Sequence, residues 1–274
     1  MAANLKQQIL RKARQAGAEL TGFAPVERWA RYAETPEPFF PQNIFPFTRT
    51  VITMAVPIFI PILDTTPSIV YSELYNTTNR MLDEMAYRLA VFINNSGYRA
   101  APFPRDGYGD ISVLVKRPEA AFSHVLAARY AGLGTIGFNH TLLTPRYGPR
   151  VRLVSVLTDA AVEPDPVMEK SLCTRCMLCL RCCPTASLTD TRQPVASMDK
   201  TRCAIYHKEL KEQYRYPCGV CIKVCPVGAD RERYGANTRK YLDEKKVLDE
   251  NPLAPDYAGW VHMRTFGAIN PNDK

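Results

Sequence analysis

The nine cysteines of this 274-residue chain all lie between Cys173 and Cys225, and the first 172 residues contain none. Structural disulfides would be spread through a secreted fold, and a reducing cytosol would not maintain them. Cysteines gathered in one short segment indicate metal ligation instead. The chemistry of the protein is therefore expected to begin in this segment.

The spacing of these cysteines is typical of a bacterial ferredoxin with two [4Fe–4S] clusters. The run from Cys173 to Pro184 follows the pattern C-x2-C-x2-C-x3-C-P when its fourth cysteine is Cys183. In this pattern three thiolates on a tight loop bind one cluster, and the fourth cysteine points away and binds the other. A second run, from Cys218 to Pro226, contains another C-x2-C pair and another Cys-Pro ending.

Eight of the nine cysteines divide between two clusters, and Cys182 is left without a metal. The expected ligands are Cys173, Cys176, Cys179 and Cys225 for cluster one, and Cys183, Cys203, Cys218 and Cys221 for cluster two. Zinc is the alternative, because paired C-x2-C elements also form zinc sites. The Cys-Pro endings and the crossed ligands favour iron–sulfur clusters. Such clusters transfer single electrons at low potential and need an acceptor, since they carry out no substrate chemistry of their own.

Charge and hydropathy narrow the class of partner and the compartment. The formal charge is +8 with a pI near 9.0, which suits an acidic partner, either nucleic acid or a small acidic electron carrier. A solvated basic surface without a partner would look the same. The most apolar stretch, Val51 to Leu63, is interrupted by Pro57 and Pro61 and is shorter than the roughly 20 residues that span a bilayer. The N-terminus lacks the apolar region of a signal peptide, so a cytoplasmic protein without a membrane span is expected.

The first half of the chain alternates between predicted helices and strands. Hydrophobic periodicity predicts helices over residues 5–16, 68–95 and 118–132, and strands over 20–24, 50–56 and 151–157. The sequence Glu163-Pro164-Asp165-Pro166 predicts a boundary, and from there to about Gly228 we expect only short turns and cysteines. The predicted organisation is an α/β (α+β) domain at 1–165, a two-cluster ferredoxin-like domain at 166–235, and a C-terminal helix and tail at 236–274.

Segments beside the cysteine runs resemble a known superfamily. Residues 131–137 read AGLGTIG, residues 142–153 read LLTPRYGPRVRL, and residues 198–206 read MDKTRCAIY. Together with the cysteines, they resemble the superfamily of epoxyqueuosine reductases and corrinoid reductive dehalogenases. The resemblance implies a nitroreductase-like α/β domain that holds cobalamin without an axial ligand from the protein. It also implies a ferredoxin domain that reduces the cobalt.

The resemblance also suggests which residues contact the cofactor. Those candidates are Gly132, Gly134, Gly137, Phe138, Arg150 and Tyr206. From the residues alone, the glycines could equally end a helix. The weak candidates for a catalytic proton donor are Tyr75, Asp106, Tyr108 and His140. Asp106 lies in a Gly-rich loop where ordinary turn chemistry is an alternative, and a histidine could instead ligate cobalt or be packed in the fold.

The chain departs from epoxyqueuosine reductases at several places. Their proton-donating Asp would fall at Pro118, and Phe138 replaces their basic residue after the glycines. Only 49 residues follow Cys225, too few for their C-terminal extension that binds tRNA. Dehalogenases are usually longer and exported. We therefore expect a small cytosolic relative that is not an epoxyqueuosine reductase.

The expected function is that of an iron–sulfur oxidoreductase. An acidic ferredoxin or flavodoxin would reduce the two clusters, and these would reduce bound cobalamin, for reduction of a small substrate or of a corrinoid. One alternative is an electron-transfer protein without a substrate, in which the first half is a docking module. Another is a flavin-dependent reductase, since nitroreductase-like folds commonly hold FMN. Nucleic acid is not expected as a partner.

Overall fold

The structure is a computed structural model that describes residues 2–235 and 238–269. Its main sheet has four strands in the order β1-β2-β6-β3, and every pairing is antiparallel. The strands are β1 (Leu20–Pro25), β2 (Thr50–Pro57), β3 (Ala100–Phe103) and β6 (Val151–Thr158). The three predicted strands are confirmed, and β3 was not predicted. Of the two terms in the predicted class, the antiparallel pairing favours α+β.

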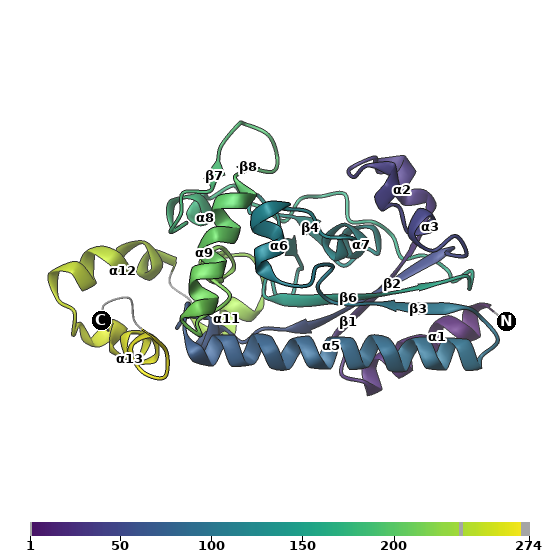
Figure 1. Ribbon diagram of the computed structural model, residues 1–274, viewed down its shortest axis with the longest axis horizontal. Coiled ribbons are helices and arrows are strands. Elements are labelled where there is room, and N and C mark those ends of the chain that lie inside the picture. Colours follow the sequence, from purple (N-terminus) through teal and green to yellow (C-terminus); the bar gives the residue numbers. More distant parts are fainter. Residues whose placement is uncertain (1, 236–237, 270–274) are drawn as a thin grey trace.

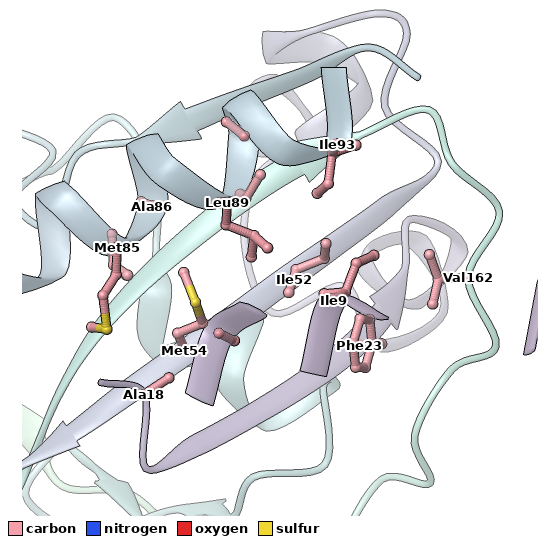
Figure 2. Close-up of a cluster of buried hydrophobic side chains, with 14 of the residues drawn as sticks. Ile9, Ala18, Phe23, Ile52, Met54, Met85, Ala86, Leu89, Ile93 and Val162 are labelled. Atoms are coloured by element: carbon pink, nitrogen blue, oxygen red, sulfur yellow. The ribbon is translucent and has the colours of Figure 1, made fainter. Parts of the chain in front are cut away.

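One face of the sheet is covered by α1 (Ala2–Gln15) and α5 (Ile69–Asn95), which run beneath it in Figure 1. In Figure 2, Ile9 of α1 and Leu89 of α5 point toward Ile52 in the centre of the sheet. Ile52 is paired with Phe23 on β1 and with Val156 on β6. Burial of an aliphatic side chain of this size contributes about 1.5–3 kcal/mol. This cluster therefore makes the sheet a rigid base for the opposite face.

The opposite face packs against α7 (His124–Tyr130) and α2 (Glu27–Tyr32). The ring of Trp29 meets the ring of Tyr130 edge to face, with centroids 4.9 Å apart. The remaining elements of the first half are η1 (Glu37–Phe39), α3 (Pro41–Ile44), α4 (Ile60–Leu63), α6 (Ile111–Lys116), β4 (Thr135–Ile136) and β5 (Leu142–Leu143). Both faces of the sheet are thus buried, which explains why β2 carries few polar residues.

The helix starts follow local capping. Ser68 accepts a hydrogen bond from the backbone N–H of Tyr71 at 3.3 Å, which confirms the predicted start of α5. The predicted start of α7 at Pro118 is wrong, because Ser123 caps that helix and accepts from Leu126. The six residues before it are held differently: the backbone N–H of Ala121 donates to Gly107 at 2.9 Å. These residues belong to a loop and not to the helix.

The cysteine segment contains more regular structure than the sequence predicted. Helix α9 (Lys200–Glu212) lies where only short turns were expected, and Asp199 caps it by accepting from Arg202 at 2.8 Å. The smaller elements are α8 (Leu178–Arg181), β7 (Leu188–Thr189), β8 (Ser197–Met198), α10 (Val220–Lys223) and α11 (Asp230–Tyr234). Few residues of α9 are buried, so hydrophobic periodicity does not indicate the helix.

The C-terminal part forms two helices, α12 (Thr238–Glu250) and α13 (Ala258–Thr265), joined through η2 (Pro255–Tyr257), where one helix and a tail were predicted. Two ion pairs at Glu244 of α12 join this helix to α10 and to α13. Lys223 donates to Glu244 at 2.9 Å, and Arg264 binds the other oxygen of the same carboxylate. The hydroxyl of Tyr241 donates to Asp64 at 2.6 Å and connects α12 to the end of α4.

None of the helices in the described ranges combines the length and apolar character needed to cross a lipid bilayer.

Candidate functional site

The four cysteines expected to bind cluster one surround a small cavity. Cys173 and Cys176 come from the loop before α8, Cys179 from α8, and Cys225 from the turn after α10. The loop bends sharply because Arg175 and Met177 have positive φ angles of 52° and 60°. This bend turns the three sulfurs of the loop toward Cys225.

The thiols around this cavity are crowded. Burial, followed by the proximity of Cys225, Cys176 and Cys173, raises the pKa of the Cys179 thiol to about 12. Thiols that oppose one another's ionisation need a cation before they can all become thiolates. A cluster of iron ions supplies that charge, so the donor set fits the predicted cluster.

The four cysteines expected to bind cluster two form a second group. Cys203 lies on α9, Cys221 on α10, and Cys183 and Cys218 lie in turns. Burial raises the pKa of Cys218 to about 12, and nearby Cys203 and Cys183 add to the shift. Burial also raises the pKa of Cys203 to about 11, and the negative charge of Cys183 adds to the shift.

The adjacent cysteines Cys182 and Cys183 have opposite surroundings. The sulfur of Cys183 accepts from the backbone N–H of Ser187 at 3.4 Å and lies 3.4 Å from the hydroxyl of Thr185. Although burial opposes ionisation, these hydrogen bonds lower the pKa of Cys183. The sulfur of Cys182 instead lies 3.9 Å from the carbonyl oxygen of Tyr241, on the side of α12. Hydrogen bonds therefore favour ionisation of Cys183, and the sulfur of Cys182 is directed toward α12 instead.

The loop of the second C-x2-C pair is pressed against α5. A Cβ on Gly219, whose φ is +69°, would lie 2.7 Å from a ring carbon of Tyr71. The hydroxyl of Thr66 donates to the carbonyl oxygen of Cys218. Only glycine allows this close approach, which fixes Cys218 and Cys221 relative to the first half of the chain.

Across the described residues, no three His, Cys, Asp or Glu side chains converge on a single ion position.

A large cavity of about 910 Å³ separates the cysteine segment from the sheet. Its wall combines α5, residues 105–126 with α6 and the start of α7, the ends of β5 and β6, and α9. All four cysteines of the second group also line it: Cys183, Cys203, Cys218 and Cys221. The volume is that of a cofactor or ligand site. A molecule bound there would be next to cluster two.

A group of tyrosines lines the same cavity. The hydroxyl of Tyr216 lies 3.4 Å from that of Tyr75 and 3.2 Å from that of Tyr108. Burial, with a smaller contribution from neighbouring Tyr75, raises the pKa of both Tyr108 and Tyr216. The guanidinium of Arg152 lies 4.2 Å from the centre of the Tyr75 ring and 3.3 Å from Asp106. Tyr108 and Tyr216 thus keep their protons close to the guanidinium of Arg152.

Three histidines line the cavity, and their ring nitrogens or faces contact the protein. In His124, Nδ1 lies 2.9 Å from the Ser155 hydroxyl and Nε2 lies 2.8 Å from the Pro104 carbonyl, and burial lowers the pKa to about 4. Nε2 of His140 lies 2.8 Å from the carbonyl of Ala196. The ring of His207 packs against Tyr216, and burial lowers its pKa to about 4.

Comparison of sequences gives two groups of relatives, while no protein-family model matches the chain. The tetrachloroethene reductive dehalogenase of Desulfitobacterium hafniense strain Y51 is 26% identical over 94% of this chain and 44% of its own length. The epoxyqueuosine reductase of Synechococcus sp. strain RCC307 is 38% identical over 36% of this chain and 32% of its own length. The chain thus spans less than half the length of these relatives.

Solved structures of both kinds share the fold. A catabolic reductive dehalogenase in complex with 3-bromo-4-hydroxybenzoic acid aligns with a TM-score of 0.64 at 17% identity, over 96% of this chain and 38% of that one. Epoxyqueuosine reductase from Streptococcus thermophilus aligns with a TM-score of 0.55 at 19% identity, over 81% and 66%. The resemblance to the epoxyqueuosine reductase and reductive dehalogenase superfamily is confirmed. At this identity the structural likeness itself shows the fold alone.

The structure places the glycines of the superfamily segment away from the large cavity. Gly132, Gly134 and Gly137 do not line the large cavity. A Cβ on Gly134 would lie 1.9 Å from the carbonyl oxygen of Leu143, and one on Gly132 would lie 2.3 Å from that of Pro166. The close approach of the chain to itself is therefore enough to require these glycines, and their contact with a cofactor stays a prediction.

Two further cofactor candidates, Phe138 and Arg150, lie beside the first group of cysteines. Phe138 is buried against Leu188 and lines the small cavity with the cysteines. Arg150 is fully buried, binds Asp230 through two nitrogens at 2.7 and 2.6 Å, and donates to the carbonyl of Cys225 at 3.0 Å. Both side chains contact the cysteine loops, and their role as cofactor contacts stays a prediction.

The other candidates do line the large cavity: Tyr75, Asp106, Tyr108, His140 and Tyr206. The sequence reasoning did not single out Tyr216, although this residue joins Tyr75 to Tyr108. Tyr216 is 141 positions from Tyr75 along the chain, so no local pattern connects them. Tyr216 lies between residues 198–206, which resemble the superfamily, and the second C-x2-C pair. This position was the one sequence feature that could have indicated its place in the site.

Proposed function

We propose that this chain is an iron–sulfur reductase that passes single electrons through two [4Fe–4S] clusters to cobalamin in the large cavity, for reduction of a small organic substrate. One observation carries the proposal: the four cysteines of the second group and the three clustered tyrosines line the same cavity. An electron source and a proton source would then face one bound molecule. That the named relatives are reductases supports the same class of activity.

Cobalamin fits the chemistry of this cavity. When bound and reduced, it supplies a strongly nucleophilic and strongly reducing cobalt centre. One structure with this fold, at a TM-score of 0.62, is described as suggesting a mechanism for B12-dependent dehalogenation. Both ring nitrogens of His124 face hydrogen-bond partners, so this histidine would not be available to bind the cobalt. Tyr206, on α9, is the predicted cofactor contact that lines the cavity.

The tyrosines are proposed to supply the proton that reduction of an organic substrate requires. Tyr75, Tyr108 and Tyr216 form a connected hydroxyl group, and burial keeps the latter two protonated. Arg152, above the Tyr75 ring, would stabilise a tyrosinate left after transfer. Asp106 holds Arg152 and is therefore proposed to position the cation.

The charged groups beside the tyrosines favour an uncharged substrate. Arg152 is bound to Asp106 at 3.3 Å and to Asn79 at 2.8 Å. Arg105 is paired with Asp83. Because these charges are already neutralised within the wall, a charged substrate would lose its hydration without gaining a partner. A small, neutral organic molecule is thus the proposed substrate class, and this distinguishes the chain from enzymes that act on tRNA.

The test is anaerobic reconstitution of the full chain with iron and sulfide, in the presence of hydroxocobalamin or of FMN, followed by visible spectroscopy. The proposal expects about eight iron per chain, because two cubanes need four each. It also expects cobalamin, and not FMN, to stay with the protein through gel filtration. Retention of FMN would support a flavin-dependent reductase, and retention of neither would support an electron-transfer module. Stoichiometric zinc, or about four iron, would contradict the two clusters.

A further inference from the structure

Cluster one has an open side. Of the nine cysteines, all within the described ranges, Cys176 is the one classed as exposed, and Cys218 is buried. The cysteines of the second group instead line the internal cavity. An electron from outside the protein therefore has its most direct entry at Cys176.

Arginines surround this entry. Arg181 donates to the carbonyl oxygen of Cys176 at 3.2 Å. Arg175 lies over the ring of Phe138 at 5.2 Å and pairs with Asp190 at 2.9 Å. Arg192 lies in the same turn, because its backbone N–H donates to Asp190 at 2.8 Å. Arg175, Arg181 and Arg192 thus lie along one edge of the molecule.

The net charge of this edge is positive. Residues 170–195 contain four basic residues and one acidic residue, and Arg175 already neutralises that acid. In Figure 1 this segment, with α8, β7 and β8, lies at the upper edge, away from α5. Arg181 and Arg192 are both exposed, so their charges reach solvent.

We propose that the Cys176 surface, formed by Cys176, Arg175, Arg181 and Arg192, is the docking site for a small acidic one-electron carrier protein. This inference rests on the proposed function, because it needs a cluster bound behind Cys176. The step transfers one electron: the carrier is oxidised, cluster one is reduced, and no bond or proton moves. Complementary charge raises the association rate of such pairs, by factors of about 10 to 1,000 at low salt.

A protein carrier fits this surface better than nucleic acid does. Its three arginines lie around the proposed cluster one, where positive charge would attract an acidic electron carrier. Binding of nucleic acid commonly draws on about six or more phosphate contacts and on exposed aromatic rings for stacking. The one aromatic ring here, Phe138, is buried beneath Arg175.

The experiment measures reduction of the clusters in the full, anaerobically reconstituted chain by a plant-type [2Fe–2S] ferredoxin, whose surface is acidic. The double variant Arg181→Glu/Arg192→Glu reverses two charges and leaves the Arg175–Asp190 pair intact. Stopped-flow absorbance gives the second-order rate constant at low and at high ionic strength. We expect the variant to be slower by about tenfold or more at low salt, and the difference to disappear at high salt.

The matched control is Arg80→Glu/Arg88→Glu, which makes the same change in net charge on exposed positions of α5. It should react at nearly the wild-type rate, and iron content is checked in every protein.

An equal rate in the Arg181/Arg192 variant, or equal slowing in both variants, would overturn the docking site while leaving the proposed function intact. A difference that persists at high salt would indicate a damaged cluster and also overturn it. Weaker binding of a labelled oligonucleotide with an unchanged rate would assign the surface to nucleic acid. A wild-type chain without clusters would overturn both proposals.

Discussion

At the scale of single residues, the site depends on which groups can hold or lose a proton. Backbone and hydroxyl hydrogen bonds lower the pKa of Cys183, whereas burial raises the pKa of its neighbour Cys182. Burial also keeps His124 neutral and keeps the hydroxyls of Tyr108 and Tyr216 protonated. Burial opposes the charged form of each of these groups. At Cys183 the hydrogen bonds to the sulfur outweigh that effect and favour ligation, whereas Tyr108 and Tyr216 keep the protons that they could donate.

The first prediction follows from the contrast between the two adjacent cysteines. Cys182→Ser should keep about eight iron per chain, and Cys183→Ser should keep about four, because only cluster two loses a ligand. Iron and sulfide analysis of anaerobically reconstituted protein measures both, and each variant serves as the control for the other. Loss of iron from Cys182→Ser with retention in Cys183→Ser would show that the ligand assignment is shifted by one residue.

The second prediction concerns the buried His124. Its pKa is lowered to about 4 by burial, so the unfolded chain binds a proton more readily at mildly acidic pH. The contribution of His124 to the free energy of unfolding should therefore be fully present above the ordinary histidine pKa. It should fall as pH decreases toward 4, by about 3 kcal/mol for this group. In His124→Gln this part of the pH dependence should be lost. Anaerobic thermal unfolding at about pH 7 and about pH 5 gives the comparison, and identical pH dependence in both proteins would contradict it.

At the scale of elements, the helices and strands with a strong hydrophobic pattern were predictable and those positioned by their neighbours were not. The pattern identified α1, α5, β1, β2 and β6 to within a few residues. Helix α9 was missed because its buried side chains are only Ala204 and Leu210. Its clearest local signal is Asp199, an N-cap residue directly before it. Strand β3 is short and contains Pro102, which disguises it as a loop.

The third prediction tests the cap of α9. Asp199→Ala should lower stability by about 1 kcal/mol, because the N–H of Arg202 loses its acceptor. Cys203 lies in that first turn, so cluster two should also lose iron faster to a chelator. Asp199→Asn keeps a capping oxygen and is the control. Equal iron loss from the Ala and Asn variants would show that the cap does not hold Cys203.

The fourth prediction separates the structural role of Gly134 from a role in cofactor contact. Gly134→Ala should be strongly destabilising even without any cofactor, because its Cβ would overlap the carbonyl oxygen of Leu143 and push β4 and β5 apart. Gly259→Ala is the matched control: its Cβ meets open space within α13, and the change should stabilise the helix by up to about 1 kcal/mol. Thermal unfolding measures both variants. A Gly134→Ala protein as stable as wild type would instead favour the interpretation that Gly134 contacts a cofactor.

At the scale of the whole molecule, the large cavity belongs to neither half of the chain. The sequence predicted the cysteine groups because their spacing is local, but the tyrosine group joins α5, the 105–126 segment and the turn before Cys218. Only folding brings these together, so their meeting could not be predicted from spacing. The domain limits at residues 165 and 235 stay a prediction. Contacts cross both limits: Arg150 binds Asp230, and Glu244 binds Lys223.

The last prediction concerns the state of the cobalt in that shared cavity. Hydroxocobalamin, titrated into the cluster-loaded chain and mildly reduced, should give a cob(II)alamin electron paramagnetic resonance signal without nitrogen superhyperfine splitting. One reason is that both ring nitrogens of His124 face partners in the protein. In His140, Nε2 faces the carbonyl of Ala196, an arrangement that a metal-binding histidine also shows, so a His140 variant is included in the test. Free cob(II)alamin with its own base bound is the control, since its signal is split. A split signal that disappears in His140→Ala would contradict the prediction and identify the ligand. No binding at all, with both clusters intact, would favour an electron-transfer module without a substrate.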